Sequence, residues 1–417
     1  MFYLKAALIT LIGWLTVALL IAFATINGWW YTPMVADADA KAFMQAASKV
    51  IESENVGNVA LVLIEDGEVY GQHFAAVSQE LDKHTLFAAA SMSKWVTALG
   101  VMKLVQQGKI DLDVPITGYL SRWQLPDSDF HNEKVTVRQL LSHTSGLADG
   151  LGFGDYRADE TLPSLEASLS HPRASSGREV SLALAREPGT EWDYSGGGYL
   201  ILQLIIEEVS GQRFATFMQE TIFNPLAMTR STYNYIGTLE NRADSYDRQG
   251  QQAPLYQYAC SAATGLSSSV SDMTKLVRSL LAGSHSPAFL RQDTISAMRK
   301  PNASLMGFDI WGLGTILYAS TASGDVIYGH DGQNDPAINS AVRINPDTGD
   351  AIIAFSSGNP SLATKLGFEW VFSQTGKPDF LGLGYVIPGG LRVLSLASML
   401  TLLIAGVLTW RRRPNAR

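Results

Sequence analysis

Two residues that can act together in nucleophilic catalysis stand one helical turn apart in ASMSKWVTAL, residues 90–99. They are Ser91 and Lys94. Side chains three residues apart share one face of a helix, and the apolar residues that follow form a stripe behind them: Val96, Leu99, Met102 and Val105. A serine hydroxyl becomes an effective nucleophile when a nearby base, such as a partly desolvated lysine, takes its proton. The start of a helix also adds positive potential for a developing oxyanion. The alternative is that Ser91 or Ser93 caps the helix and Lys94 is solvated, because S-x-x-K alone is a weak motif.

Two later segments could complete such a site. Tyr194 lies in PGTEWDYSGGGYLILQLIIEEVSG (188–211), just before an apolar helical pattern. A tyrosine beside a lysine ammonium can act as a general acid or base. In YGHDGQNDPA (328–337), a strand pattern ends in His330, Asp331 and Gly332, where a backbone amide could donate to an oxyanion. The alternatives are a core tyrosine under a glycine-rich turn and an ordinary histidine at a strand end.

Taken in this order, the three elements resemble the class C β-lactamase and penicillin-binding serine hydrolase family over about residues 40–375. The likeness includes SMSK, VTVRQLLSHTSGL (135–147), PGTEWDYSGGGY, AATGLSSSVSDMTKLVRSLL (262–281), WGLG (311–314) and GHDG. The resemblance implies that Ser91 is the acylated nucleophile and that Lys94 and Tyr194 are its proton-transfer partners. It also implies an oxyanion hole made of the backbone amides of Ser91 and Gln333, and it makes His143 structural.

The sequence departs from the family where substrates are recognised. Gly196 replaces the asparagine of the family's Tyr-x-Asn, which removes an amide that would contact a substrate carbonyl. His330, Asp331 and Gly332 replace Lys-Thr-Gly, and we assign these three residues to substrate binding together with Gly196. A neutral imidazole next to a carboxylate holds a substrate carboxylate poorly, so we expect neutral esters or amides to be preferred. Protonation of His330 toward pH 6 should narrow that preference.

One residue could compensate for the lost lysine. Arg343 lies on the following strand pattern, but strand alternation alone does not tell which face of the sheet it occupies.

Strand patterns at both ends of the central region must position these residues. ADADAKAFMQAASKVIESE (36–54) predicts an amphipathic helix, and NVALVLIEDGEVYGQHFA (58–75) predicts two strands around an Asp-Gly turn. Strand patterns return in 324–332 and 339–358, with NPDTGD as a hairpin turn, and a last helix is predicted over 361–376. We therefore predict an α/β fold of the α+β type. Its antiparallel sheet is built from both ends of the domain, flanked by helices, and carries a mostly helical inserted region, as in the β-lactamase/transpeptidase-like fold.

Both ends of the chain predict membrane helices. Residues 6–26 and 393–410 carry no charge and are long enough, or nearly so, to cross a bilayer. Aromatic residues at 29–31 suit a membrane interface. A cleaved signal peptide is the alternative for the first segment, because Ala22-Phe23-Ala24 resembles a cleavage site, but the apolar run is longer than usual.

Basic residues predict the orientation of these two segments. Lys5 and the arginines at 411–413 place both ends in the cytoplasm. The expected organisation is an N-terminal anchor (1–31), a hydrolase domain (32–380) and a C-terminal transmembrane helix with a basic tail (391–417). The hydrolase domain would lie on the periplasmic or extracellular side of the cytoplasmic membrane.

Composition limits the possible functions. The chain has 417 residues, 46% of them hydrophobic and 17% charged, which is enough for one large core. A net charge of −8 and a pI near 5.4 argue against nucleic-acid binding. The single cysteine, Cys260, rules out a disulfide framework within the chain, and the seven histidines show no metal-binding spacing, so we expect no metal and no cofactor.

The function predicted is a membrane-anchored serine hydrolase that cleaves an amide or ester through an acyl-enzyme on Ser91, as a peptidase, amidase or esterase. Its partners would be a small-molecule or peptide substrate and the lipid bilayer, and the sequence sets no oligomeric state. The alternative is a catalytically lapsed module that binds cell-wall peptides or a membrane partner, with Gly196 marking the loss.

Overall fold

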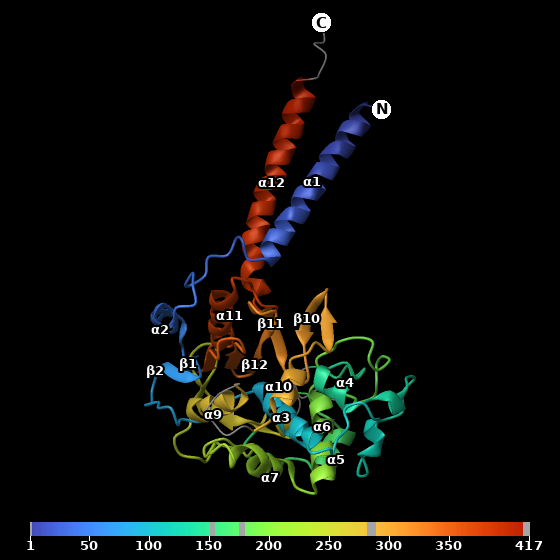
Figure 1. The fold of residues 1–417 in the computed structure, drawn as a ribbon, viewed down its shortest axis with the longest axis vertical. Helices are drawn as coiled ribbons and strands as arrows, with labels where there is room; N and C mark the ends of the chain where they lie inside the picture. The colour runs from blue at the N-terminus through green and yellow to red at the C-terminus, as the bar shows by residue number, and fades with distance from the viewer. Residues whose placement is uncertain (1, 151–154, 175–179, 282–288, 412–417) are drawn as a thin grey trace.

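The computed structural model describes residues 2–150, 155–174, 180–281 and 289–411. The two apolar ends form long helices, α1 (Phe2–Ile26) and α12 (Leu383–Arg411), which lie side by side and project from the rest of the molecule (Figure 1). They touch closely: the Trp14 indole donates to Ser398 Oγ at 2.9 Å, and a Cβ on Gly390 would lie 2.0 Å from Thr25 Oγ1. The glycine therefore permits this helix crossing.

By length and composition, Ala7–Ile26 and Leu383–Leu408 could each cross a membrane. The second helix begins at Leu383, before the predicted segment 393–410, and continues through Pro388 and Arg392. The charge of Arg392 is what shortened the segment recognised in the sequence. Of the arginines at 411–413, residues 412 and 413 lie outside the described residues.

The central domain is built on one eight-stranded antiparallel sheet in the order β2-β1-β14-β13-β12-β11-β10-β9. The strands are β1 (Asn58–Glu65), β2 (Glu68–Ala75), β9 (Ala303–Leu305), β10 (Phe308–Trp311), β11 (Ile316–Ser320), β12 (Val326–Asn334), β13 (Ile338–Ile344) and β14 (Ala351–Ser357). The first strand pairs with the last, β1 with β14, so the predicted sheet built from both sequence ends is confirmed. Strands β9, β10 and β11 were not predicted from the sequence.

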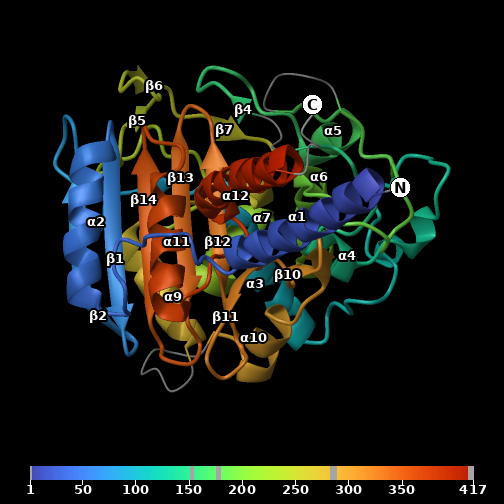
Figure 2. The same cartoon turned by 90° about the horizontal axis from the view of Figure 1, so that it is seen from above.

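Each face of the sheet carries its own apolar core. In β1, Val59, Leu61 and Leu63 face α2 (Ala40–Glu54) and α11 (Leu362–Thr375), whereas the alternate residues face the inserted helical region. Figure 2 shows α2 and α11 covering the face of the sheet that lies toward α1 and α12. The sheet is therefore the middle layer of three, the arrangement expected for an antiparallel sheet buried on both faces.

The inserted region between β2 and β9 is mostly helical and loop-like, as predicted. Its helices are α3 (Met92–Gln106), α4 (Val137–Ser142), α5 (Leu165–Ser170), α6 (Gly196–Ser210), α7 (Phe214–Met218), α8 (Ser261–Thr264), α9 (Val270–Leu280) and α10 (Gln292–Met298), with single turns at η1 (Ile116–Gly118), η2 (Asn132–Lys134) and η3 (Gln219–Phe223). Three small ladders join β3 (Phe87–Ala88) to β8 (Ser267–Ser268), β4 (Asp155–Tyr156) to β7 (Gln257–Tyr258), and β5 (Ser245–Tyr246) to β6 (Gln252–Ala253).

Helix α3 runs through the middle of this region. All residues from Met92 to Met102 are buried, so this part of the helix has no solvent face, and its buried surface is wider than the predicted apolar stripe. The N-terminus of α3 reaches β12, and this contact forms the candidate site.

Candidate active site

Ser91 stands at the N-cap position of α3, immediately after a strained turn. Ala90 has φ +48°, a left-handed conformation that a non-glycine residue rarely adopts. The Ser91 side chain makes no capping hydrogen bond, and Lys94 Nζ instead donates to Ser91 Oγ at 3.2 Å. The interpretation of Ser91 as a helix cap is therefore not what the structure shows, and its hydroxyl remains available as a nucleophile.

Lys94 is buried rather than solvated. The residue is 1% exposed, and Nζ also donates to the Ala263 carbonyl at 3.0 Å. Nζ lies 4.9 Å from the ring centroid of Tyr194 and 5.8 Å from that of Tyr199. A buried amine needs such polar and aromatic partners, and this set directs it at Ser91. The structure thus brings together the three residues that the sequence predicted to be catalytic.

An aromatic cluster holds Tyr194 in place. The imidazole of His143 lies against it with ring centroids 4.4 Å apart, and Trp311 meets it edge-on at 5.6 Å. His143 Nδ1 accepts a hydrogen bond from the Ser195 amide at 3.0 Å. Burial lowers the pKa of His143 well below its usual value, and the positive charge of Lys94 acts in the same direction. A neutral His143 therefore supports the Tyr194 ring, in agreement with the structural role that the resemblance implies.

Sequence reasoning missed Asp149. This residue is 3% exposed, and its Oδ2 accepts hydrogen bonds from the Ser195 hydroxyl and the Gly197 amide, each at 2.7 Å. Burial raises the pKa of Asp149 to about 7, although both hydrogen bonds and Lys94 oppose the change. A Cβ on Gly197 would lie 2.1 Å from Oδ2, so a glycine is needed there. Asp149 fixes the start of α6, directly after Tyr194. No spacing in HTSGLADG pairs it with Ser195, so sequence alone offers no signal.

Gly196 is the first residue of α6 and is buried. Having no side chain, it places no amide beside the nucleophile. The expected loss of a contact with the substrate carbonyl therefore remains a prediction.

Strand β12 lies against the turn that carries Ser91. A Cβ on Gly332 would lie 2.2 Å from the Ala89 carbonyl oxygen and 3.1 Å from the Met92 nitrogen, so only glycine permits this approach. Ser340 of the neighbouring β13 also donates to the Ala89 carbonyl at 2.7 Å. The role of Gly332 is thus to let the backbone of β12 lie close to the backbone of the turn that carries Ser91.

The position of Gln333 is compatible with an oxyanion donor. β13 pairs with β12 from Tyr328 to Asn334, whereas the register of β11 along β12 ends at Gly329. The Gly329 carbonyl accepts from Thr315 on the β11 side. Because backbone groups of residues i, i+2 and i+4 point to the same edge, the Gln333 amide points to the edge that β11 leaves uncovered.

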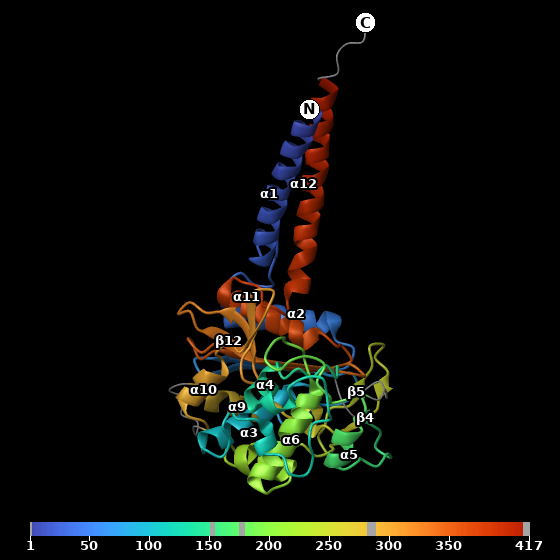
Figure 3. The same ribbon diagram turned by 90° about the vertical axis from the view of Figure 1, so that its right-hand side faces the viewer.

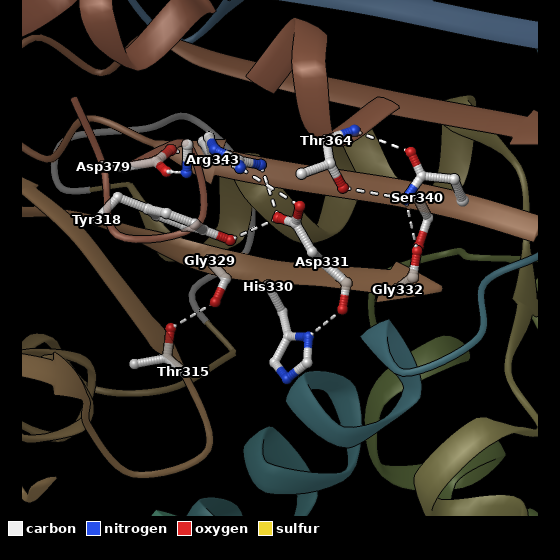
Figure 4. A network of polar contacts seen from close by, with 12 residues as sticks. Thr315, Tyr318, Gly329, His330, Asp331, Gly332, Ser340, Arg343, Thr364 and Asp379 are labelled. Carbon is white, nitrogen blue, oxygen red and sulfur yellow. Dashed lines mark hydrogen bonds and ion pairs between the residues drawn. The ribbon is translucent and has the colours of Figure 1, made fainter. Parts of the chain in front are cut away.

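Asp331 does not join the site. Strand alternation sends its side chain to the opposite face of the sheet from His330 (Figure 4). There its carboxylate accepts from the Tyr318 hydroxyl at 2.7 Å and from Arg343 Nη1 at 2.6 Å. Arg343 is fully buried and also lies 3.5 Å from Asp379. The expected negative charge beside the substrate is thus not found there, and Arg343 occupies the wrong face to compensate for the family's lysine.

His330 does face α3, and it is 1% exposed. Its Nδ1 is hydrogen-bonded to the Asp331 carbonyl. Burial lowers the pKa of His330 to about 4, with a further contribution from Lys94. Protonation of His330, which we expected near pH 6 from the sequence, is therefore moved to about pH 4, because the imidazole ring is desolvated.

Among the residues that the structure describes, no group of three or more His, Cys, Asp or Glu could hold a metal ion. Cys260 is buried and free, and burial raises the pKa of its thiol to about 12. It is therefore a poor nucleophile.

Comparison with known proteins agrees with this geometry. The chain matches the family model of Beta-lactamase over residues 37–369 and therefore belongs to the beta-lactamase family, whose members are serine hydrolases. The family resemblance and the fold class predicted from the sequence are thereby confirmed.

Individual relatives match this chain at low sequence identity and over part of their length. Penicillin-binding protein 4* of Bacillus subtilis (strain 168) is 31% identical over 200 residues, which cover 46% of this chain and 41% of that protein. The matched region thus spans less than half the length of that curated relative.

Solved structures show the same fold. The octameric penicillin-binding protein homologue from Pyrococcus abyssi has a TM-score of 0.64 and 23% identity, covering 81% of this chain and 78% of that one. D-amino acid amidase from Ochrobactrum anthropi SV3 has a TM-score of 0.61 and 23% identity, covering 86% of this chain and 99% of that one.

Proposed function

We propose that this chain is a membrane-anchored serine hydrolase that cleaves an amide or ester through an acyl-enzyme on Ser91. The observation that carries the proposal is the position of the buried Lys94 side chain. Its Nζ lies 3.2 Å from Ser91 Oγ, which makes no helix-capping hydrogen bond, and 4.9 Å from the ring centroid of Tyr194. A lysine placed in this way is suited to act as a base toward the serine.

The reaction would proceed in two halves. In the first, Lys94 in its amine form, with Tyr194, takes the proton of Ser91 as Oγ bonds to the substrate carbonyl carbon. The backbone amides of Ser91 and Gln333 would stabilise the resulting oxyanion. Collapse returns the proton to the leaving amine or alcohol and leaves the acyl group on Ser91. In the second half, water, deprotonated by the same groups, attacks the acyl carbon and releases the acid and Ser91.

The substrate would be a neutral ester or amide rather than one with a free carboxylate near the scissile bond. His330 stands where the family has lysine, and its depressed pKa keeps it neutral at pH 7. Arg343 is directed to the other face of the sheet and is paired there with Asp331. The similarity to a D-amino acid amidase makes D-amino acid amides the first compounds to test.

Two helices would anchor the hydrolase. The proposed organisation is an anchor over 1–31, the hydrolase domain over 32–380 and a second span with a basic tail over 391–417. The Tyr31 hydroxyl is hydrogen-bonded to Glu369 of α11, so the segment after α1 is tied to the domain. We place the domain on the outer side of the cytoplasmic membrane.

The second candidate is a binding module that has lost catalysis, and the observation that favours it is Gly196. Incubation with a fluorophosphonate probe separates the two functions. Labelling that disappears in Ser91→Ala supports the hydrolase, whereas a folded wild-type protein that does not label would support the binding module.

A further inference from the structure

A cavity of about 600 Å³ lies where the two long helices meet the edge of the sheet. One part of its wall comes from Ile26 at the end of α1 and Leu383 at the start of α12. Another part comes from the β9–β10 hairpin and β11, through Phe308 and Tyr318. If α1 and α12 span a bilayer, this cavity opens at the level where they leave it.

The charges on this wall are unequal. Arg299 is paired with Asp325 at 2.6 Å, and Asp379 lies in the buried network of Arg343. Lys300 and Lys377 also line the cavity; both are exposed, and neither side chain has a hydrogen-bond or ion-pair partner within the described part of the chain. Among the described residues of the wall, Asp309 is the one other charged residue, and its carboxylate accepts a hydrogen bond from the Ser304 hydroxyl at 2.6 Å. The two ammonium groups of Lys300 and Lys377 therefore outnumber the one carboxylate that has no ion-pair partner, which favours an anion.

The hairpin next to the cavity has an unusual tip. Met306 and Gly307, both with positive φ, form the turn between β9 and β10. Met306 is 89% exposed and Phe308 is 39% exposed, although hairpin turns in water usually carry polar residues. Figures 1 and 3 show this hairpin on the same side of the domain as α1 and α12. An apolar tip in that position fits the boundary between headgroups and acyl chains.

Aromatic residues mark the same level. Trp29 and Trp30, which follow α1 directly, are 67% and 41% exposed. Exposed tryptophans gather at membrane interfaces, where their rings are half in apolar surroundings.

We propose that this cavity binds the headgroup of an anionic phospholipid, with Lys300 and Lys377 facing its phosphate. The acyl chains would run along α1 and α12, and the hairpin tip, Met306 and Phe308, would enter the outer leaflet. This inference rests on the proposed membrane anchoring. It gives the domain a third contact with the bilayer, which would prevent it from swinging about the pair of helices and would fix the height of the Ser91 site.

Binding can be measured with the full chain in detergent micelles, titrated with short-chain phosphatidylglycerol, short-chain phosphatidylcholine and inorganic phosphate. We expect phosphatidylglycerol to bind at least about fivefold more tightly than phosphatidylcholine, since two ammonium groups face a lipid with net negative charge. The double variant Lys300→Glu/Lys377→Glu should lose that difference. The matched control Lys83→Glu/Lys109→Glu changes the net charge equally at exposed lysines outside the cavity and should keep it. Equal affinity for both lipids, equal loss in the control, or phosphate bound as tightly as phosphatidylglycerol would overturn the proposal.

Insertion of the hairpin tip has a separate readout. The only native cysteine, Cys260, is fully buried, so a bimane label reacts selectively with an introduced Met306→Cys. In anionic nanodiscs, lipids spin-labelled near the headgroup should quench this label. They should not quench it on Thr216→Cys, an exposed site on α7 at the far end of the molecule (Figure 1). Equal quenching at both sites would contradict the proposal.

Two controls separate failure of this inference from failure of its premises. Flotation of the wild type with liposomes reports anchoring, and fluorophosphonate labelling of the charge-reversed variant reports the hydrolase site. We expect the charge-reversed variant to lose the preference for phosphatidylglycerol but to keep its fluorophosphonate labelling, while the wild type floats with the liposomes. A wild type that floats and labels but shows no preference disproves the lipid site alone.

Discussion

Ser91 can be tested by removing its hydroxyl. We expect Ser91→Ala to abolish hydrolysis and fluorophosphonate labelling while the protein stays folded. The side chain makes no capping bond, so the change should cost less than the ~1 kcal/mol of a lost cap. Turnover of a D-amino acid amide measures the loss of hydrolysis, and circular dichroism checks that the variant is folded.

Lys94→Ala and Tyr194→Phe should each lower turnover nearly as much as Ser91→Ala does. The double variant Lys94→Ala/Tyr194→Phe should be little less active than either single variant, because both residues act on one proton path.

Asp149 gives a pH-dependent prediction. Its pKa is about 7 in the folded protein, above the usual carboxyl value of 3.8. The native state therefore holds this proton more tightly than the unfolded chain does, and its contribution to stability is lost as pH rises toward and through about 7. A tenfold difference in proton affinity between the two states corresponds to about 1.4 kcal/mol. Asp149→Asn, which cannot ionise, should gain stability relative to wild type as the pH is raised from about 5 to about 8.

Thermal unfolding of both proteins at the two pH values measures this gain, with Asp129→Asn, an exposed carboxyl, as the matched control. A difference in Tm between Asp149→Asn and wild type that stays constant with pH would show that Asp149 does not titrate in this range.

At the residue scale, the residues that we propose to react could be identified from the sequence, but the groups that hold them could not. Ser91 and Lys94 are close in the chain, and Tyr194 stands in a recognisable segment. Asp149 acts on Ser195 and Gly197 through contacts that only the tertiary fold creates. The pKa of His330 likewise depends on its burial beside α3, which no local pattern reveals.

At the scale of single elements, β12 shows why register matters. One strand directs His330 to the site and Asp331 to a buried network on the other face. The alternation of side chains can be recognised in the sequence, but which residues face the site cannot, since a shift of one residue exchanges the two faces of the sheet. The role expected for Asp331 near the substrate is wrong for this reason, and Arg343, whose face the sequence left open, lies on the same far side of the sheet.

The buried network of β12 and β13 should contribute strongly to stability. Asp331→Ala leaves the guanidinium of Arg343 with only Asp379, at 3.5 Å, as a counter-charge, and we expect a loss of about 3–5 kcal/mol. Adding Arg343→Leu should recover part of that loss, because the guanidinium is removed and the Asp379 carboxyl, whose pKa is raised by burial, can become neutral by taking up a proton. Chemical unfolding followed by tryptophan fluorescence measures both. A double variant that is less stable than Asp331→Ala alone would contradict a charge-based explanation.

The same strand leads to a prediction about specificity. We expect wild-type kcat/KM to be higher for a neutral amide or ester than for a matched substrate with a free carboxylate. His330→Lys should raise the relative rate for the carboxylate substrate, because it places a cation on the α3 face. Asp331→Asn should leave the ratio unchanged, because Asp331 points away from the site. A wild-type preference for the carboxylate would mean that another cation holds it.

At the scale of the whole molecule, the sheet could be predicted from the strand patterns at the two ends of the central domain. β1 and the hairpin of β13 and β14 have long alternating or continuous apolar patterns, and an Asp-Gly turn marks the start of β2, so these strands were predictable. Strands β9, β10 and β11 have only three to five residues, too few for alternation to be distinguished from a loop. Those unpredicted strands carry the hairpin next to the lipid cavity.

The arrangement of α1 and α12 leads to the last prediction, which concerns topology. The start of α1 and the end of α12 lie at the same end of the pair, away from the domain (Figure 1). If both helices span the bilayer, both chain ends must therefore lie on one side and the hydrolase on the other, whatever the flanking charges are. Lys5 and the arginines at 411–413 decide which side, and the excess of positive charge assigns the ends to the cytoplasm. A reporter fused after Arg413 should be active in the cytoplasm, and protease added to spheroplasts should digest the domain. A protected domain would reverse the orientation, whereas a mature N-terminus near Thr25 would show that the first helix is removed as a signal peptide.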